Sequence, residues 1–493
     1  MKKTKIICTI GPATDRPGVL EQMIQNGMNV ARLNFSHGEH ADHQIRIDQV
    51  KQLREKLGEP IAILLDTKGP EIRTRDLKDG KAELVEGQEF TLTTNQEMGD
   101  NTRVSVSYDL LHEELQPGMH MLISDGLIEM VVKEIKGRDI ICEVKNFGTL
   151  GNRKSINIPN VHINMPYISQ KDYDDILFGI KNDIDFVAAS FMRTPEDAKA
   201  IRALLDDNGG KDIHIIAKIE NQKGVENASE ILKICDGLMI ARGDMGVEVP
   251  LEDLPAIQKK LIKHCFSAGK ISITATQMLD SMIRNPRPTR AETTDVANAI
   301  YDSTSAIMLS GETAIGEYPL ESLEMMVRIA EATESNIHYR RRFQTSHLFM
   351  EKTITNAIGH ATVLTAFELD VSAILTVSSS GNTARTISKF RPDKPIICST
   401  HHQKTQMQLA LSWGVFPIIS ELKDTTDSLF THAVQRAMEE GYLNCGDMVA
   451  ITAGTATGIS GTTNTLKIHI VGDSDKFDQD ATCDLPDEVI AKV

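Results

Sequence analysis

Residues 29–65 read NVARLNFSHGEHADHQIRIDQVKQLREKLGEPIAILL, and this stretch sets the pattern for much of the chain. An apolar run at 29–35 is followed by a segment of helical period at 41–57 and then by a second apolar run at 61–65. Nearly continuous apolar runs that alternate with helices are typical of parallel strands covered on both faces. The stretch therefore predicts one strand–helix–strand unit of an α/β fold.

The same unit recurs along the first two thirds of the chain. Eight apolar runs occur there, at residues 5–10, 29–35, 61–65, 184–189, 214–219, 237–241, 271–275 and 306–309. Segments of helical period also follow at 195–205, 254–266 and 291–301. Eight strand–helix units predict a (β/α)8 TIM barrel, which we assign to residues 1–69 and 168–345.

The spacing of the runs is broken once, between the third and the fourth. Residues 66–183 separate these two runs, far more than a strand–helix connection needs. Short alternating pieces fill this region, at 89–93, 103–108, 120–123, 127–135 and 139–144, and pairs such as Asp79–Gly80 and Pro117–Gly118 mark turns between them. We expect a small β-barrel lid domain at residues 70–167, inserted into the barrel.

A second α/β pattern follows the barrel. Its predicted strands lie at 373–377, 395–398, 415–419, 448–451 and 466–471, with helices between them. This pattern predicts a doubly wound C-terminal α/β domain at residues 346–473. Residues 474–493 are acidic and aperiodic and are expected to form a flexible tail.

Composition excludes several classes of protein. The 493 residues carry 53 Lys and Arg against 69 Asp and Glu, a net charge of −16, whereas nucleic-acid binding needs a basic face. No apolar run approaches the ~18 residues of a membrane-spanning helix. The seven cysteines are scattered and form no CxxC pair, so reduced thiols in the cytoplasm are expected instead of zinc or disulfides.

Polar side chains follow six of the eight apolar runs, at the ends that line the catalytic face of a barrel. They lie in the segments 32–37, 66–68, 218–220, 242–244, 276–277 and 310–312. A single buried Lys or Glu is more often part of a structural ion pair. Six convergent segments of cations, carboxylates and hydroxyls favour a functional site.

The residue types narrow the chemistry. Glu220 and Asp244 offer hard oxygen ligands that suit Mg²⁺ or Mn²⁺. Three cationic side chains could stabilise the negative charge of a phosphoryl group during its transfer, namely Arg32, Arg73 and Lys218. An all-oxygen set with one negative charge suits a large monovalent cation; its members are Asn34, Ser36, Asp66 and Thr67. The chain has no GxxxxGK[ST] loop, so a nucleotide would be held by other means.

Seven ordered motifs give the chain a family resemblance. They are ARLNFSHG (31–38), LDTKGPEIRT (65–74), IAKIEN (216–221), ARGDMGVE (241–248), ITATQMLDSMI (273–283), NPRPTRAE (285–292) and MLSGET (308–313). The chain resembles the pyruvate kinase family, bacterial type, over about residues 1–473. The resemblance implies a barrel, a lid domain and a C-terminal α/β domain, as the run pattern predicts.

The resemblance also implies an activity and roles for residues. Such enzymes transfer the phosphoryl group of phosphoenolpyruvate to ADP, which gives pyruvate and ATP. By resemblance, the catalytic residues are Arg32, Lys218 and Thr276, and the substrate is held by Arg32, Gly243, Asp244 and Thr276. Mg²⁺ would bind Glu220 and Asp244, and K⁺ would bind Asn34, Ser36, Asp66 and Thr67. The nucleotide would contact Asn34, His37, Arg73 and Lys154.

Glu71 bears on the monovalent cation. In the family, an acid in the GPEIR motif accompanies dependence on K⁺, whereas a Lys there substitutes for the ion. We therefore expect K⁺ activation. The alternative is that Glu71 merely pairs with a neighbouring Arg.

The C-terminal domain carries a candidate anion site in the loop that precedes residues 384–390, a segment of helical pattern. Its residues are Ser378, Ser379, Ser380, Gly381, Asn382 and Thr383. Small hydroxyl residues and Gly at the start of a helix can bind an anion, although a tight turn with a helix N-cap would look the same. By resemblance this loop and residues 454–465 would bind a phosphorylated allosteric effector.

The sequence is compatible with three functions. The active phosphotransferase, expected as a cytoplasmic homotetramer, is favoured because each matched position is retained. An enzyme that makes or breaks carbon–carbon bonds in phosphoenolpyruvate or pyruvate is one alternative. A non-catalytic sugar-phosphate sensor on the same scaffold is the other.

Overall fold

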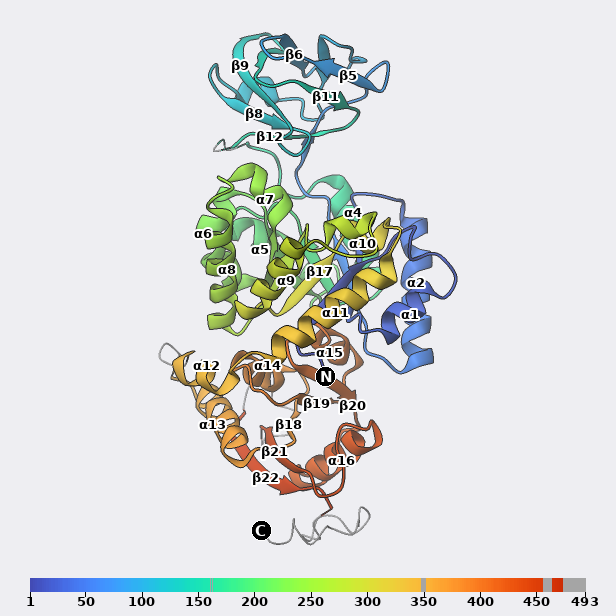
Figure 1. The fold of residues 1–493 in the computed structure, drawn as a ribbon, viewed down its shortest axis with the longest axis vertical. Helices are drawn as coiled ribbons and strands as arrows, with labels where there is room; N and C mark the ends of the chain where they lie inside the picture. Colours follow the sequence, from blue (N-terminus) through green and yellow to red (C-terminus); the bar gives the residue numbers. More distant parts are fainter. Residues whose placement is uncertain (160, 162, 347–351, 455–462, 473–493) are drawn as a thin grey trace.

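The computed structural model describes residues 1–472, except 160, 162, 347–351 and 455–462. Three bodies follow one another along its long axis (Figure 1). A β domain lies at one end, an eight-stranded barrel in the middle and an α/β domain at the other end. The predicted tail, residues 474–493, lies outside the described residues.

The central sheet is a closed barrel of parallel strands. Its order is β1-β17-β16-β15-β14-β13-β3-β2, so strands adjacent in the barrel follow the chain around it. The bounds are β1 Lys5–Thr9, β2 Val30–Asn34, β3 Ala62–Asp66, β13 Phe186–Ala189, β14 His214–Ile219, β15 Gly237–Ala241, β16 Ile271–Ala275 and β17 Ala306–Leu309. All eight predicted runs are therefore strands of one (β/α)8 barrel, which confirms the predicted fold class.

Alternation along each strand decides which side chains enter the barrel. In β14, Ile216 belongs to the cluster inside the barrel, whereas Ile215 and Ala217 pack against the outer helices. Because side chains on a strand alternate with period two, Lys218 shares the inner face with Ile216. The same argument places Asp66 above the inner residue Leu64. Charged side chains thus meet at the carboxyl end of the barrel.

Helices cover the outside of the barrel. They are α1 Val19–Gln25, α2 His40–Leu57, α4 Gln170–Lys181, α5 Pro195–Asp207, α6 Gln222–Ile234, α7 Arg242–Glu248, α8 Leu254–Ala268, α9 Arg290–Tyr301, α10 Gly311–Ala314 and α11 Pro319–Ser335, with a 3₁₀ turn at Asp280–Ile283. Local sequence explains where several begin: Thr194 caps α5 in a capping box, directly before Pro195 at the first helical position.

The inserted domain lies between β3 and β13 and has its own apolar core. Seven strands form one sheet in the order β4-β12-β8-β9-β10-β6-β7, and β5 pairs with β11. The bounds are β4 Ile72–Arg73, β5 Lys81–Leu84, β6 Glu89–Thr93, β7 Arg103–Ser105, α3 Leu111–Glu114, β8 His120–Ile123, β9 Ile128–Lys136, β10 Asp139–Val144, β11 Gly148–Gly151 and β12 Ser155–Asn157. Only two stretches of chain join it to the barrel (Figure 1).

The C-terminal domain is a five-stranded sheet in the order β20-β19-β18-β21-β22. Its elements, with the preceding helix α12 Tyr339–Ser346, are α13 Ile354–Leu369, β18 Ala373–Val377, α14 Asn382–Lys389, β19 Ile396–Thr400, α15 Gln403–Leu409, β20 Val415–Ile419, α16 Thr426–Glu439, β21 Met448–Ala453 and β22 Thr465–Ile470. One apolar cluster joins α13 and α14 to the sheet, and another joins α16 to it.

The last strand departs from a purely parallel sheet, since β22 runs antiparallel to β21. Residues 454–464 connect the two strands, fewer than the roughly a dozen that a parallel crossover needs.

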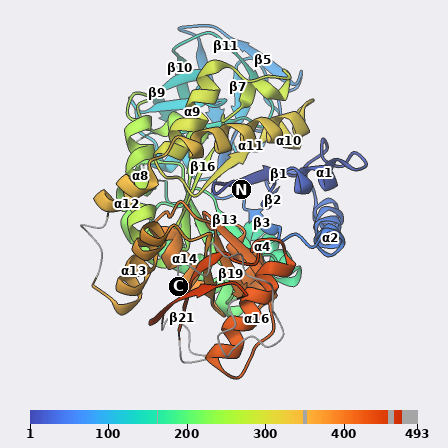
Figure 2. The ribbon, with the colours of Figure 1, turned by 60° about the horizontal axis from the view of Figure 1, so that its bottom comes forward.

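The C-terminal domain closes the amino end of the barrel. In Figure 2 its sheet and helices lie in front of the barrel strands. Ala410 and Leu411 belong to the apolar cluster that fills the barrel. The Lys5 ammonium donates to the carbonyl of Val415 at 2.6 Å, and the Gly414 amide donates to the carbonyl of Lys3 at 2.8 Å. The two domains therefore share a packed contact at the foot of the barrel.

The cysteines depart in one place from the expectation of reduced thiols. Cys8, Cys142, Cys235, Cys265 and Cys398 are free and buried. Cys445, by contrast, is disulfide-bonded. It lies half-buried in the turn between α16 and β21, where a thiol is accessible to a partner. Among the residues that the structure describes, no helix has the length and apolar character needed to cross a membrane.

Candidate active site

A charged network occupies the carboxyl end of the barrel, centred on Lys218. Its ammonium lies 2.9 Å from Asp66 Oδ1, 3.0 Å from Glu220 Oε1 and 2.7 Å from Ser190 Oγ. Arg32 reaches the other oxygen of Asp66 through Nε at 2.7 Å. These four charged groups come from β2, β3 and the end of β14, and each is at least nine-tenths buried. The barrel thus brings together side chains up to 188 positions apart, from Arg32 to Glu220.

The network fixes the protonation of its members. Burial opposes charge on Lys218, but Asp66 and Glu220 more than offset it and raise the pKa of the ammonium above its usual range. The pKa of Asp66 is lowered, because Arg32 and Lys218 outweigh its burial. Burial, with Asp244 and Asp66 nearby, raises the pKa of Glu220 to about 7 even though Lys218 opposes the shift. Lys218 is therefore a fixed cation, whereas Glu220 titrates near neutral pH.

Asp244 and Thr276 lie beside this network. Asp244 is in the first turn of α7, directly after β15, and its carboxylate has no hydrogen-bond or ion-pair partner among the described residues. The Gly243 amide donates to Thr276 Oγ at 2.7 Å. Thr276 has a φ of 66°, a left-handed conformation that a β-branched residue rarely adopts. The Arg242 guanidinium donates to the carbonyl of Thr276 at 2.8 Å and helps to hold this turn.

The two carboxylates suit a divalent cation. No group of three or more His, Cys, Asp or Glu with metal-ligand geometry occurs in the part of the chain that the structure describes. Mg²⁺ does not need such a group, because it commonly binds one or two carboxylates together with water and substrate oxygens. The unpartnered Asp244 and the raised pKa of Glu220 both indicate negative charge that a cation would stabilise. The donor set fits Mg²⁺ or Mn²⁺.

The four residues expected to hold K⁺ lie next to one another. Strand register pairs Asn34 with Asp66, and Thr67 follows directly. Asn34 Oδ1 accepts from the Ser36 amide at 3.2 Å, while Thr67 Oγ1 accepts from the Ser190 amide at 3.1 Å. The ends of β2 and β3 therefore gather an all-oxygen group.

The expected nucleotide side of the site is a cavity of about 510 Å³ between the barrel and the inserted domain. It is lined by His37, Arg73 and Lys154, as the sequence predicts, and by Ser36. Two further cations, Lys68 and Arg153, also line it. Arg73 pairs with Glu71 at 2.7 Å, so the pairing considered for Glu71 does form. The cavity gathers the positive charge that nucleotide phosphates require.

The loop of residues 378–383 follows β18 and precedes α14. Gly381 has a φ of 77° and lies directly before the helix. The carbonyl of Ser379 accepts from Thr405 Oγ1 at 2.9 Å, and Thr383 Oγ1 contacts Thr463 Oγ1 at 2.7 Å. The loop is thus held from two sides. Of the second loop, residues 455–462 lie outside the described residues.

Sequence reasoning missed Ser190 and Arg153, and it placed Lys68 in a strand-end segment without assigning it to the nucleotide. Ser190 contacts Lys218, and its hydroxyl donates to the carbonyl of Thr67 at 2.6 Å. It is the first residue after β13, so the rule that identified the other segments also applies to it. Conversely, the carboxylate of Glu312, in a segment grouped with the site, accepts from the backbone amides of Leu279 and Ser310. Glu312 therefore holds loops in place.

Comparisons with known proteins agree with this geometry. The model of the pyruvate kinase barrel domain matches residues 1–323, and that of the pyruvate kinase alpha/beta domain matches residues 356–469. A pyruvate kinase of Staphylococcus saprophyticus is 51% identical over 96% of this chain and 81% of its own length. One of Clostridium acetobutylicum is 49% identical over 96% of this chain and its whole length.

A solved structure supports the same assignment. The crystal structure of a pyruvate kinase from Cryptosporidium parvum superposes with a TM-score of 0.89 at 38% identity, and the match covers 95% of this chain and 96% of that one. Sequence motifs, domain order and the charged network at the barrel's carboxyl end lead to one conclusion: the chain is an enzyme of the pyruvate kinase family.

Proposed function

We propose that this enzyme transfers the phosphoryl group of phosphoenolpyruvate to ADP and depends on Mg²⁺ (or Mn²⁺) and K⁺. The observation that carries the proposal is the buried network of Lys218, Asp66, Glu220 and Arg32. In phosphoryl transfer the protein mainly positions the reactants and stabilises charge on the equatorial oxygens. A permanently protonated Lys218 between two carboxylates is suited to that role.

Arg32 has a free donor for the substrate phosphate. Its Nε contacts Asp66 and its Nη1 donates to Thr9 Oγ1 at 2.8 Å, whereas its Nη2 has no partner among the described residues. Two fixed nitrogens orient the guanidinium, and the third remains to bind an oxyanion. Removal of Arg32 should therefore weaken substrate binding and transition-state stabilisation together.

Glu220 and Asp244 would hold Mg²⁺. When bound, the ion would supply positive charge that stabilises negative charge on the substrate during transfer. Thr276 and the backbone amides at the start of α7 would receive the substrate carboxylate. The Gly243 amide donates to Thr276 Oγ, so this hydrogen bond has to break before the amide can bind the substrate carboxylate. The Thr276 hydroxyl also donates to the carbonyl of Ala275 at 2.6 Å, which makes it a positioning group for the proton that reaches the enolate.

The nucleotide and K⁺ roles extend the proposal. ADP phosphates would occupy the cavity lined by His37, Arg73 and Lys154; Asn34, also expected to contact the nucleotide, does not line this cavity but lies two positions before its lining residue Ser36. K⁺ would bind Asn34, Ser36, Asp66 and Thr67, and Glu71 is the acid that accompanies K⁺ dependence. Glu71 lies 2.7 Å from Arg73, one of the residues that line the nucleotide cavity.

Regulation and assembly are part of the proposal. A phosphorylated effector would bind residues 378–383, where Ser378, Ser379 and Ser380 are half-exposed. A homotetramer is supported by large apolar side chains exposed on α13, namely Ile354, Leu364 and Leu369. A cytoplasmic location follows from the family resemblance.

The test is pyruvate formation from phosphoenolpyruvate and ADP, with Mg²⁺ and with either K⁺ or Na⁺. Turnover that requires both Mg²⁺ and K⁺ is expected. Good turnover in K⁺-free sodium buffer would overturn the K⁺ assignment. A folded protein with no turnover under any condition would favour a sugar-phosphate sensor.

A further inference from the structure

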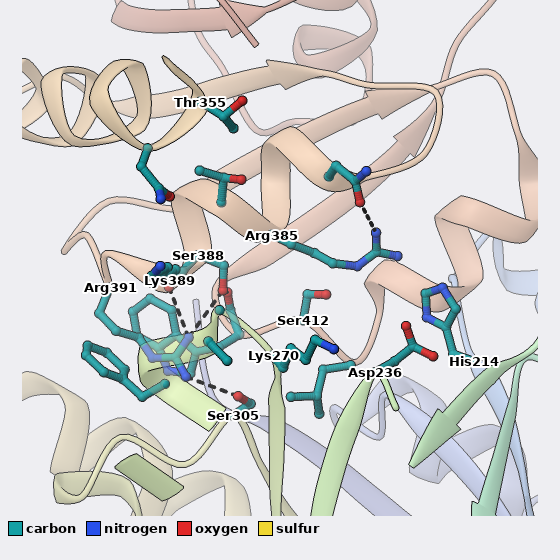
Figure 3. Close-up of a pocket in the computed structure, with 18 residues that line it drawn as sticks. His214, Asp236, Lys270, Ser305, Thr355, Arg385, Ser388, Lys389, Arg391 and Ser412 are labelled. Carbon is teal, nitrogen blue, oxygen red and sulfur yellow. Dashed lines mark hydrogen bonds between the residues drawn. The ribbon is translucent and has the colours of Figure 1, made fainter. Parts of the chain in front are cut away.

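A cavity of about 450 Å³ lies at the foot of the barrel, on the side away from the active site, and Figure 3 shows the side chains that line it. We call it the interdomain cavity. The barrel contributes His214, the first residue of β14, and Asp236, directly before β15. The C-terminal domain contributes Arg385 from α14 together with Arg391 and Ser412. In Figure 3 the guanidinium of Arg385 extends toward His214 and Asp236.

The charge of the interdomain cavity is strongly positive. Its lining holds four cations, Lys270, Arg385, Lys389 and Arg391, against one carboxylate, Asp236. Burial lowers the pKa of Arg391 to about 9 and also lowers that of Arg385. The negative groups near each guanidinium are therefore too weak to offset the cost of burying its charge. Arg391 lies over the Trp413 ring at 4.6 Å from its centre, which fixes the guanidinium plane.

Unpaired polar atoms concentrate at this cavity. Four lining side chains carry a buried atom without a hydrogen-bond partner among the described residues: His214 Nδ1, Arg385 Nη2, Arg391 Nε and Ser412 Oγ. Arg391 and Ser412 are only 5% and 3% exposed. Buried donors without partners are costly and in native proteins usually bond to water, an ion or a ligand. The unpaired donors include one nitrogen from each of two guanidinium groups, and a charged N–H is a strong donor to an oxyanion.

We propose that the interdomain cavity binds a phosphate group, either free or as part of a small metabolite. Arg385, Lys389 and Arg391 supply the charge, and Ser412 supplies a hydroxyl donor. This site adjoins the effector loop: Asn382 of the loop lines the cavity, and Arg385 Nη1 donates to the carbonyl of Ser380 at 2.8 Å. An occupant would therefore contact a side chain that also supports the loop.

The position of the cavity couples it to catalysis. β14 begins at His214 and leads to Lys218 and Glu220, while β15 begins after Asp236 and leads to Asp244. A ligand held between these strand ends and α14 stabilises one arrangement of the two domains. Phosphate binding is therefore expected to change the KM for phosphoenolpyruvate.

Calorimetric titration of the full chain, without substrates, tests the proposal. Inorganic phosphate, a sugar monophosphate and AMP are titrated separately. All variants are made in a chain in which Ser378, Ser379 and Ser380 are replaced by Ala, so that the three serine hydroxyls of the loop do not contribute. Lys389→Gln should raise the Kd about tenfold or more, as expected for loss of a charge-assisted contact. Ser412→Ala should raise it a few-fold, and because its hydroxyl is unpaired, folding should be unaffected.

Lys394→Gln is the matched control. Lys394 pairs with Asp370 at 2.6 Å and does not line the interdomain cavity, so its replacement should leave the Kd unchanged. Binding of inorganic phosphate identifies a free anion as the ligand, whereas binding of an ester alone identifies a metabolite. No binding of any of the three probes, or equal Kd values for Lys389→Gln, Ser412→Ala and the unmodified cavity, overturns the proposal. The readout is independent of turnover, so failure of the proposed function would not affect it.

Discussion

Ser190→Ala should slow catalysis without unfolding the protein. The Ser190 hydroxyl lies 2.7 Å from the Lys218 ammonium and donates to the carbonyl of Thr67 at 2.6 Å. It thereby links Lys218, the cation proposed to stabilise the phosphoryl group, to a residue of the expected K⁺ site. Alanine removes both contacts and leaves Lys218 held only by Asp66 and Glu220.

The size of the effect follows from these contacts. A hydrogen bond to a charged group contributes roughly 1.5–3 kcal/mol. If that stabilisation is needed mainly in the transition state, kcat should fall roughly 10- to 150-fold, at about 1.36 kcal/mol per factor of ten. The KM for phosphoenolpyruvate should change less than kcat, because Arg32 and the groups around Thr276 remain.

Steady-state kinetics and thermal unfolding of Ser190→Ala and Ser322→Ala make the comparison. Ser322 is fully buried in α11, and its hydroxyl donates to the carbonyl of Tyr318 at 2.7 Å, far from the charged network. Each variant loses a buried serine hydroxyl, so both should lose about 1 kcal/mol of stability. Only Ser190→Ala should lose kcat. A kcat within twofold of the unmodified enzyme would refute the role assigned to Ser190.

Four further predictions concern the same face of the barrel. Lys218→Met should abolish measurable turnover and lower the free energy of unfolding by ~3–5 kcal/mol, because it leaves Glu220 buried without a cation and Asp66 with Arg32 alone; turnover above one thousandth of the original kcat would contradict this. The raised pKa of Glu220, about 7, predicts that Mg²⁺ binds more weakly at pH 6 than at pH 8, since the ion must displace a proton. Without metal, the folded protein binds the Glu220 proton more tightly than the unfolded chain does, so the free energy of unfolding should fall as pH rises from the unfolded pKa, near 4.5, through the folded pKa, about 7. Unfolding at several pH values, with and without Mg²⁺, measures this fall. Glu71→Lys should retain turnover in K⁺-free buffer, and an unchanged requirement for K⁺ in this variant would argue against the cation site.

The sequence alone was sufficient for the barrel. All eight apolar runs became its strands, because a strand buried on both faces requires a continuous apolar run that polar insertions would disrupt. The rule that strand ends line the catalytic face of a barrel then placed Lys218 and Asp66 at its carboxyl end. The motifs around these residues indicated the family from local sequence alone. Local chemistry, repeated along the chain, was enough for these conclusions.

Tertiary structure decided what local patterns do not encode. The direction of β22 depends on pairing with β21 and on the length of its connection, and an apolar run looks the same in either direction. The pairing of Glu71 with Arg73, and the contact of Ser190 with Lys218, required side chains to be placed in space.

The interdomain cavity shows the same limit most clearly. His214 and Arg385 lie 171 positions apart in the chain and meet only where the C-terminal domain closes the barrel. Electrostatic interactions and hydrogen bonds depend on distances between atoms, and the fold sets those distances, whereas hydrophobic periodicity is written into the order of the residues.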